Sequence, residues 1–232
     1  MASNIDKQRA VQSIAKDVLE ALGPTIHALD TEHSIAQRAV QMLGDSGVKE
    51  TWYYNCLAFV LLGSRSRRSE SGRTYQSAFE LVGSNNLVTV DLSPLLGGLW
   101  GDCARSFCIE NGQHTSSPIG IDFIDGLAAE QTLHEAMRHF VKPATTFCEL
   151  YEYANQKIRA LDFENLDFAN NLGHSIVSNR DDRIYIEASN QKLLCSVNFF
   201  TFEPHIAKIG SPWGFKHEQI YFFNNDGLLE VL

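Results

Sequence analysis

The hydrophobic pattern at the start of the chain predicts two helices. Apolar residues recur at helical spacing from Asn4 to Leu22, and Gly23 and Pro24 end the pattern. A second helical pattern begins near Thr31, a residue type that caps helices, and continues to Leu43 before a polar turn. We therefore expect a helix pair at the N-terminal end of the chain.

Strand patterns follow the helix pair. Residues 52–62 and 79–91 are rich in aromatic and β-branched side chains, and the second run leads into a predicted hairpin that continues to Phe107. Asp91 and Asp102 are equidistant from the glycine-rich turn of this hairpin. In an antiparallel pair such residues face each other, and two negative charges placed there repel unless a cation lies between them.

The same order of elements recurs in the second half of the chain. Residues 128–141 and 146–161 have helical patterns, and residues 171–223 have strand patterns. The joints of the two helix pairs, 26–31 and 141–146, also align at an offset of 115 residues. This pattern predicts a duplicated unit with halves of about 1–115 and 116–232, and a site between the halves would draw on both.

The second half also contains a carboxylate hairpin. Glu203 and Glu218 are symmetric about a loop that contains Gly210, Pro212 and Gly214. A fifth residue, His174, can supply a neutral nitrogen ligand. We interpret the four acids and the histidine as a two-metal site, because four carboxylates on apolar strands would otherwise be buried without compensation.

Composition restricts the class of protein. The chain has 232 residues and a formal net charge of −9, which disfavours nucleic acid as a partner. No signal peptide or membrane-spanning run is found, so we expect no membrane association. Five cysteines without a CxxC pair indicate a reducing compartment, and we expect a cytoplasmic protein for which a homodimer stays an open alternative.

One basic cluster departs from the acidic composition. It consists of four arginines between Arg65 and Arg73 in a serine-rich segment. The simpler interpretation is a solvated, mobile loop, and the alternative is an anion-binding rim.

Five motifs, taken in order, resemble the pita-bread metallopeptidases, a family that includes methionine aminopeptidase, aminopeptidase P, prolidase and the non-metal enzyme creatinase. Asp91 lies in a strand motif, and Asp102 begins Gly-Asp-x-x-Arg-x-Phe. His174 lies in Gly-His, and Glu203 in Phe-Thr-x-Glu-Pro. Glu218 lies in the closing strand. Five motifs in the family's order are specific where one alone would be weak.

The resemblance implies an α+β fold of the pita-bread type, here as a single catalytic domain over residues 1–232. It also implies that Asp91 is a terminal ligand of one ion, that His174 and Glu203 hold the other, and that Asp102 and Glu218 bridge the two. Such a pair of ions activates a shared water and polarises a carbonyl. Glu203 is then the proton shuttle to the leaving amine. Ligands of this kind suit manganese, cobalt, iron or zinc.

The chain lacks the auxiliary histidines that active members of this family usually carry. Asp181 stands seven residues after His174, where the peptidases typically have histidine. Three residues are candidates for substrate binding, namely Arg73, His205 and His114. Each of His205 and His217 neighbours a ligand along its strand, which predicts that both point to the opposite face. An arginine at the site would suit a free carboxylate.

The predicted function is hydrolysis of an amide next to a free amino group, in a small peptide or an amino-acid conjugate. The first alternative keeps the metals but uses them for a reaction of specialised metabolism, such as an iron-dependent oxidation. The second is a non-catalytic binding module, which we rank last because such members generally lose ligands and this chain retains all five.

Overall fold

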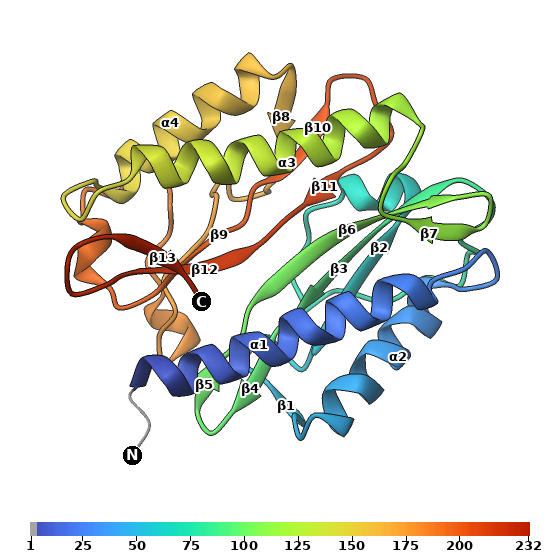
Figure 1. Ribbon diagram of the computed structural model, residues 1–232, viewed down its shortest axis with the longest axis horizontal. Helices are drawn as coiled ribbons and strands as arrows, with labels where there is room; N and C mark the ends of the chain where they lie inside the picture. Colours follow the sequence, from blue (N-terminus) through green and yellow to red (C-terminus); the bar gives the residue numbers. More distant parts are fainter. Residues whose placement is uncertain (1–3) are drawn as a thin grey trace.

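Two helix pairs enclose a layer of antiparallel strands in the computed structural model, which describes residues 4–232 (Figure 1). The first pair is α1 (Asn4–Leu22) with α2 (Glu32–Asp45), and the second is α3 (Ile121–Phe140) with α4 (Phe147–Ala160). Four short 3-10 helices occupy connections, at Gly23–Thr25, Gly63–Arg67, Arg180–Asp182 and Leu194–Ser196. The α+β class predicted from the sequence is confirmed.

The predicted N-terminal helices form as expected. In α2 the Thr31 side chain accepts a hydrogen bond from the Ser34 backbone N–H, and the Ser34 hydroxyl accepts one from the Thr31 N–H. This reciprocal cap satisfies two donors that the first helical turn would leave free. In the apolar stripe of α1, Ala15 and Leu22 are fully buried. Within residues 4–232, no helix is long and apolar enough to cross a bilayer.

The main sheet of the first half contains four antiparallel strands in the order β2-β3-β6-β7. These strands are Ala58–Leu62, Asn86–Leu92, Cys103–Glu110 and Gln113–Thr115. A smaller sheet pairs β1 (Glu50–Thr51), β4 (Pro94–Leu96) and β5 (Leu99–Trp100). The glycine-rich turn that the sequence predicts therefore belongs to the small β4–β5 hairpin.

The register of the first carboxylate hairpin differs from our prediction. Asp91 pairs with Ala104 and not with Asp102, so the turn lies between Gly97 and Gly98. Both glycines have positive φ, of 60° and 78°, which glycine adopts without strain. Since Asp102 is two residues from Ala104, the shift of the pairing keeps both aspartates on the same face of the sheet.

The second half contains two three-stranded sheets, β11-β10-β8 and β13-β12-β9. Their strands are Phe163–Asn165 (β8), Phe200–Phe202 (β9), His205–Lys208 (β10), Phe215–Lys216 (β11), Gln219–Phe223 (β12) and Leu229–Val231 (β13). Phe202 pairs with Gln219 and His205 with Lys216. Glu203 and Glu218 lie between these two pairs in the same register, so the predicted symmetry of the second carboxylate hairpin is confirmed.

Helix α3 begins seven residues before the predicted start at residue 128. Its first turns contain Gly126, a residue that interrupts a helical pattern. The structure explains this glycine, because a Cβ atom there would lie 2.1 Å from the ring of Phe215. Helix α3 packs so closely on β11 that glycine is favoured at position 126, and this glycine interrupts the helical pattern used for the prediction.

The sequence predicted more strand than the structure contains. Of residues 52–62 only Ala58–Leu62 form a strand of the main sheet, and of 79–91 the strand begins at Asn86. Between residues 171 and 199 the backbone is mostly irregular, and His174 reaches its neighbours through isolated bridges. This irregular segment nevertheless carries one of the predicted ligands.

Helix α3 is joined to β12 through a buried histidine. His134 Nδ1 lies 2.8 Å from the Tyr221 hydroxyl, and Nε2 lies 3.1 Å from the His217 carbonyl oxygen. A neutral ring satisfies both contacts, since Nε2–H donates to the carbonyl and Nδ1 accepts from the hydroxyl. Burial, the largest cause, lowers the pKa of His134 to about 4.

The low pKa of His134 predicts that the free energy of unfolding depends on pH. The unfolded chain takes up a proton near pH 6.5, whereas folded His134 does so only near its pKa of about 4, so acidification favours unfolding across that interval. From pH 7 to pH 5, His134 is expected to remove about 2 kcal/mol from the free energy of unfolding. His134→Gln keeps a donor and an acceptor without titrating. Urea denaturation in chelator should show a smaller loss for this variant, and equal losses would refute the assignment.

Candidate metal centre

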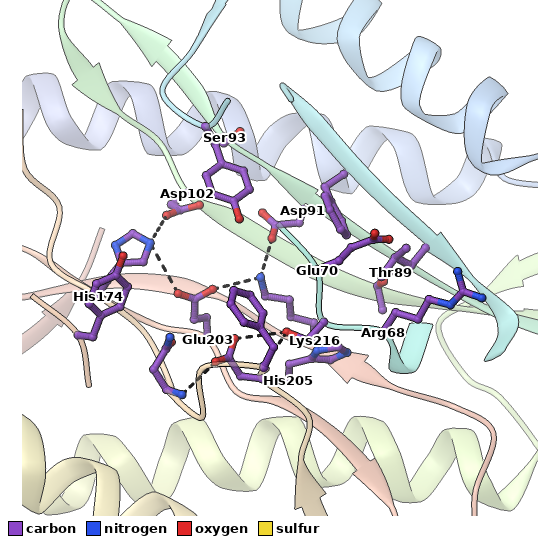
Figure 2. A pocket seen from close by; sticks show the side chains of 18 of the residues that line it. Arg68, Glu70, Thr89, Asp91, Ser93, Asp102, His174, Glu203, His205 and Lys216 are labelled. Carbon is purple, nitrogen blue, oxygen red and sulfur yellow. Dashed lines mark hydrogen bonds and ion pairs between the residues drawn. The ribbon is translucent and has the colours of Figure 1, made fainter. Parts of the chain in front are cut away.

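The five predicted ligands converge on one region. Asp91, Asp102, His174 and Glu203 line a cavity (Figure 2), and Glu218 lies beside Asp102 and His174. Asp91 comes from β3, Asp102 precedes β6, and Glu203 and Glu218 adjoin β9 and β12. Donor atoms of Asp102, His174 and Glu218 all lie within 4.8 Å of one another. The structure therefore brings together Asp102 and Glu218, which are 116 positions apart in the sequence.

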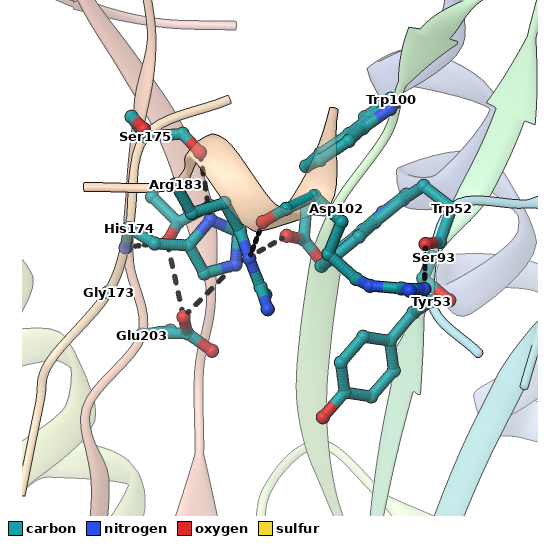
Figure 3. A network of polar contacts seen from close by, with 12 residues as sticks. Trp52, Tyr53, Ser93, Trp100, Asp102, Gly173, His174, Ser175, Arg183 and Glu203 are labelled. Carbon is teal, nitrogen blue, oxygen red and sulfur yellow. Dashed lines mark hydrogen bonds and ion pairs between the residues drawn. The ribbon is translucent and has the colours of Figure 1, made fainter. Parts of the chain in front are cut away.

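The orientation of His174 leaves one ring nitrogen directed at the acids (Figure 3). Its Nδ1–H donates to the Ser175 carbonyl oxygen at 3.0 Å, which assigns the proton to Nδ1. Nε2 then lies 3.4 Å from Asp102 Oδ2 and 3.7 Å from Glu203 Oε1. Burial lowers the pKa of His174 to about 4, so the imidazole is neutral. A neutral ring whose other nitrogen is held by a carbonyl is the usual state of a metal ligand.

Three carboxylate oxygens in the cluster lack a hydrogen-bond partner. They are Asp102 Oδ2 and both oxygens of Glu218, all shielded from solvent. The Asp102 contact with His174 Nε2 is no hydrogen bond when Asp102 is ionised, because both atoms are then acceptors. Burial and then the neighbouring acids raise the pKa of Asp102 and of Glu218 well above the usual range. A divalent cation would compensate these oxygens, so the donor set fits a metal ion.

Backbone contacts hold the acidic positions in place. The Gln12 side chain, from α1, accepts from the Asp102 backbone N–H at 2.8 Å and donates to the Asp102 carbonyl at 2.7 Å. The Glu218 N–H donates to the Ala104 carbonyl at 3.0 Å, which joins β12 to β6. Gln12 is fully buried in the apolar stripe of α1, and a polar residue in that stripe was the signal available in the sequence.

A lysine that we did not predict lies among the acids. Lys216 Nζ is 2.6 Å from Asp91 Oδ2 and 3.1 Å from Glu203 Oε2 (Figure 2). Burial favours the neutral amine, but the charges of Asp91 and Glu203 outweigh it and raise the pKa of Lys216 well above the usual value. Lys216 precedes Glu218 by two residues, so strand alternation alone would have placed both side chains on one face.

The two acids that contact Lys216 respond to it differently. Burial dominates at Asp91 and raises its pKa. At Glu203 burial acts in the same direction, but Lys216 and His174 outweigh it and lower the pKa below the ordinary value. Glu203 is therefore the acid of this site that most readily stays ionised.

A small cavity opens over the cluster, with a volume of about 150 Å³. Aromatic side chains and two arginines line it beside the acids, including Trp52, Tyr53, Tyr185, Arg68 and Arg183. Cavities for drug-sized ligands typically measure roughly 300–1,000 Å³. This cavity thus admits a small molecule or one end of a larger one.

The three predicted substrate-binding residues are separated in the structure. His205 lines the cavity, and its Nε2–H donates to the Ser66 carbonyl oxygen at 2.6 Å. The expectation that it points away was wrong, because His205 is two residues from Glu203 and returns to the same face. Arg73 is exposed over the Tyr54 ring, and His114 packs edge-on against Phe107. Neither is among the residues that line the cavity.

The arginine segment matches neither of its two interpretations fully. Arg65 forms an ion pair with the fully buried Glu32 at 2.7 Å, and Arg67 forms one with Glu164 at 2.6 Å. Both are anchored to the fold and are not free in a solvated loop. Arg68 is the member of this segment that lines the cavity.

The chain belongs to metallopeptidase family M24, whose model matches residues 6–225. A search of curated proteins gave no match.

Solved structures resemble the fold closely at low sequence identity. The X-Pro aminopeptidase from Thermotoga maritima superimposes with a TM-score of 0.79 at 19% identity, covering 98% of this chain and 60% of that one. The prolidase from Pyrococcus furiosus gives a TM-score of 0.76 at 19% identity, covering 100% and 64%. A prolidase from Thermococcus sibiricus gives 0.80 at 16%, covering 98% and 57%. The pita-bread fold is confirmed, and the chain spans about 60% of the length of these proteins.

Proposed function

We propose that this chain is a metal-dependent hydrolase that cleaves an amide bond next to a free amino group, in a small peptide or an amino-acid conjugate. The observation that carries the proposal is the cluster of Asp102, His174 and Glu218, whose unpartnered oxygens and neutral imidazole lie beside a cavity. A site with these donors in family M24 supports hydrolysis more than binding alone.

The metal-binding residues, Glu203 and Lys216 would have different roles in such a reaction. Asp102, His174 and Glu218 would hold the ion, which when bound lowers the pKa of a water and polarises the scissile carbonyl. Glu203, ionised and directed at the cavity, would accept the proton of the attacking water and pass it to the leaving amine. Lys216 holds one oxygen of Glu203 and leaves the other facing His174.

Manganese, cobalt, iron and zinc all suit this mixture of carboxylates and one imidazole. The sequence predicts two ions, and the family resemblance implies that Asp91 would be a ligand of one and that Asp102 and Glu218 would be ligands of both. That number stays a prediction. The single domain over residues 1–232, the cytoplasmic location and a homodimer are likewise proposals that rest on the sequence.

The size of the cavity and one arginine in its lining support a small substrate with a free carboxylate. Arg183 lines the cavity, and its guanidinium lies 5.3 Å from the Trp52 ring centroid and 5.3 Å from that of Tyr185. Its Nε–H donates to the Arg180 carbonyl at 2.9 Å. An arginine held in this way presents its remaining N–H groups as a fork that matches a carboxylate.

Hydrolysis of a dipeptide panel tests the proposed function. We expect release of the N-terminal amino acid by protein supplied with Mn²⁺ or Co²⁺, loss of activity in chelator, and recovery when the ion is restored. N-acetylated versions of the same dipeptides are the matched control and should not be cleaved, because they lack the free amino group. Activity that is unaffected by chelator would contradict the proposal.

Replacing Arg183 by methionine tests the carboxylate contact. We expect KM for a dipeptide to rise about 10- to 100-fold, which corresponds to one charge-assisted contact, while kcat changes little. The same variant should lose nothing on a dipeptide amide, whose C-terminus is uncharged. An equal increase of KM for the acid and the amide would show that Arg183 acts on cavity shape instead.

A further inference from the structure

We propose that the Lys216 ammonium takes the place of the second cation, so that the site binds one divalent ion per chain. This inference rests on the proposed function, since it concerns the number of ions in the same site. It changes the arrangement that the sequence predicts, in which Asp91 is a metal ligand.

The contacts of Asp91 are the first argument. Lys216 Nζ lies 2.6 Å from Asp91 Oδ2 and 3.1 Å from Glu203 Oε2, so it connects two acids that the sequence assigns to different ions. A metal ion on Asp91 would compete with the ammonium for this carboxylate at about 2 Å. The ammonium and an ion on Asp91 would share the single negative charge of this carboxylate, and their mutual repulsion weakens ion binding there.

The distribution of unpartnered atoms is the second argument. Among the residues that the structure describes, the buried acidic oxygens without a partner belong to Asp102 and Glu218, beside His174. Asp91 and Glu203 already have a positive partner. A further cation would therefore be stabilised mainly by Asp102, His174 and Glu218, whose donor atoms lie within 4.8 Å of one another.

The formal charge of the site is compatible with one ion. Four carboxylates and one ammonium meet at the site, which leaves three formal negative charges when all are ionised. One divalent ion reduces this to one negative charge, whereas two would reverse the sign inside a buried region. One ion and two ions therefore leave residual charges of equal size, and the contacts of Asp91 and the unpartnered oxygens decide between the two arrangements.

Lys216 then supplies the positive charge beside Asp91 and Glu203 that the family's second ion would otherwise supply. It is attached to the chain and fixes Asp91 and Glu203 without depending on metal supply. Ion binding therefore reduces to one site formed by Asp102, His174 and Glu218, with Glu203 Oε1 at 3.7 Å from His174 Nε2.

Metal stoichiometry tests the proposal directly. Chelator-treated protein is dialysed against excess Mn²⁺ and the bound metal is measured by elemental analysis, with isothermal titration for affinity. We expect one ion per chain in the wild type. Lys216→Met leaves Asp91 and Glu203 without a positive partner, and it should bind two ions.

Asp91→Asn separates the one-ion arrangement from the two-ion arrangement even if the lysine variant does not fold. The amide is isosteric and can still accept from Lys216, so we expect one ion, with Kd changed less than about 10-fold. Asp102→Asn is the matched control and should lose the ion. Thermal unfolding of each chelated variant verifies that it is folded.

Three outcomes are distinguishable from the expected one. Two ions in the wild type, falling to one in Asp91→Asn, would overturn the inference and leave the proposed function intact. One ion in folded Lys216→Met would also overturn it, because the lysine would not be what excludes the second. No bound ion in the wild type would contradict the proposed function itself.

Discussion

Replacing Glu218 by glutamine is expected to abolish metal binding and to lower kcat/KM at least about 100-fold, since disturbing even the residues that support metal ligands costs 10- to 100-fold. Both Glu218 oxygens are buried without a partner, and burial and nearby acids raise the pKa of this carboxyl well above its usual range. The amide removes that charge at constant size. The metal-free variant should therefore be no less stable than the metal-free wild type.

The measurements are kcat/KM on a dipeptide that the wild type cleaves, elemental analysis of bound metal, and urea denaturation in chelator. Glu135→Gln is the matched control, because Glu135 is exposed on α3 and its side chain accepts a hydrogen bond from Gln131 at 2.8 Å. It should leave all three quantities unchanged. A Glu218→Gln protein that binds metal and retains activity would exclude Glu218 as a ligand.

Replacing Gly173 by alanine is expected to destabilise the fold by about 3 kcal/mol, through backbone strain and steric overlap together. Gly173 has φ of +143°, and a Cβ atom there would lie 2.3 Å from the Thr201 carbonyl oxygen. Thr201 is paired with Ile220 in the β9–β12 ladder, so its backbone cannot retreat without breaking that pairing. The displacement would fall on His174, the next residue, and we expect metal affinity to fall as well.

Gly44→Ala provides the control for this variant. Gly44 lies in α2, and a Cβ atom there would meet nothing within 4 Å. Alanine in a helix is favoured over glycine by up to about 1 kcal/mol, so this variant should be as stable as the wild type or slightly more stable. Urea denaturation of both variants gives the comparison. A Gly173→Ala protein of wild-type stability would show that the loop before His174 adapts freely.

Helices were predicted better than strands, for a physical reason. The α1 and α2 boundaries follow from periodic apolar residues, a Thr31 cap and the Gly23-Pro24 stop, which are all local signals. Strand boundaries depend on partners distant in sequence. Residues 79–85 have a strand-like composition but no ladder partner beyond one bridge, between Leu81 and Thr31. The early start of α3 was missed because its Gly126 serves a contact with Phe215, which no local pattern reveals.

The sequence predicted which acids and which histidine form the candidate site, but it did not predict the charge pairs among the site residues. The convergence of the acids and His174 followed from motif order and strand alternation. The role of Lys216 did not, because its significance depends on Asp91, 125 residues earlier in the chain. Arg183 was not predicted as a site residue for a similar reason. It lies in an irregular segment, where strand alternation does not predict which way a side chain points. The pairing partner of Asp91 was also predicted wrongly. The prediction treated the two strands as symmetric about the glycine-rich turn, but the separate β4–β5 hairpin lies between β3 and β6.

The most direct test of the central claim is an anomalous diffraction experiment on crystals grown with Mn²⁺. The arrangement described here predicts an anomalous peak between Asp102, His174 and Glu218, within about 2.0–2.2 Å of His174 Nε2 and of a carboxylate oxygen. A well-ordered cluster without such a peak, at a metal concentration that supports hydrolysis, would contradict the claim that these residues form the metal centre.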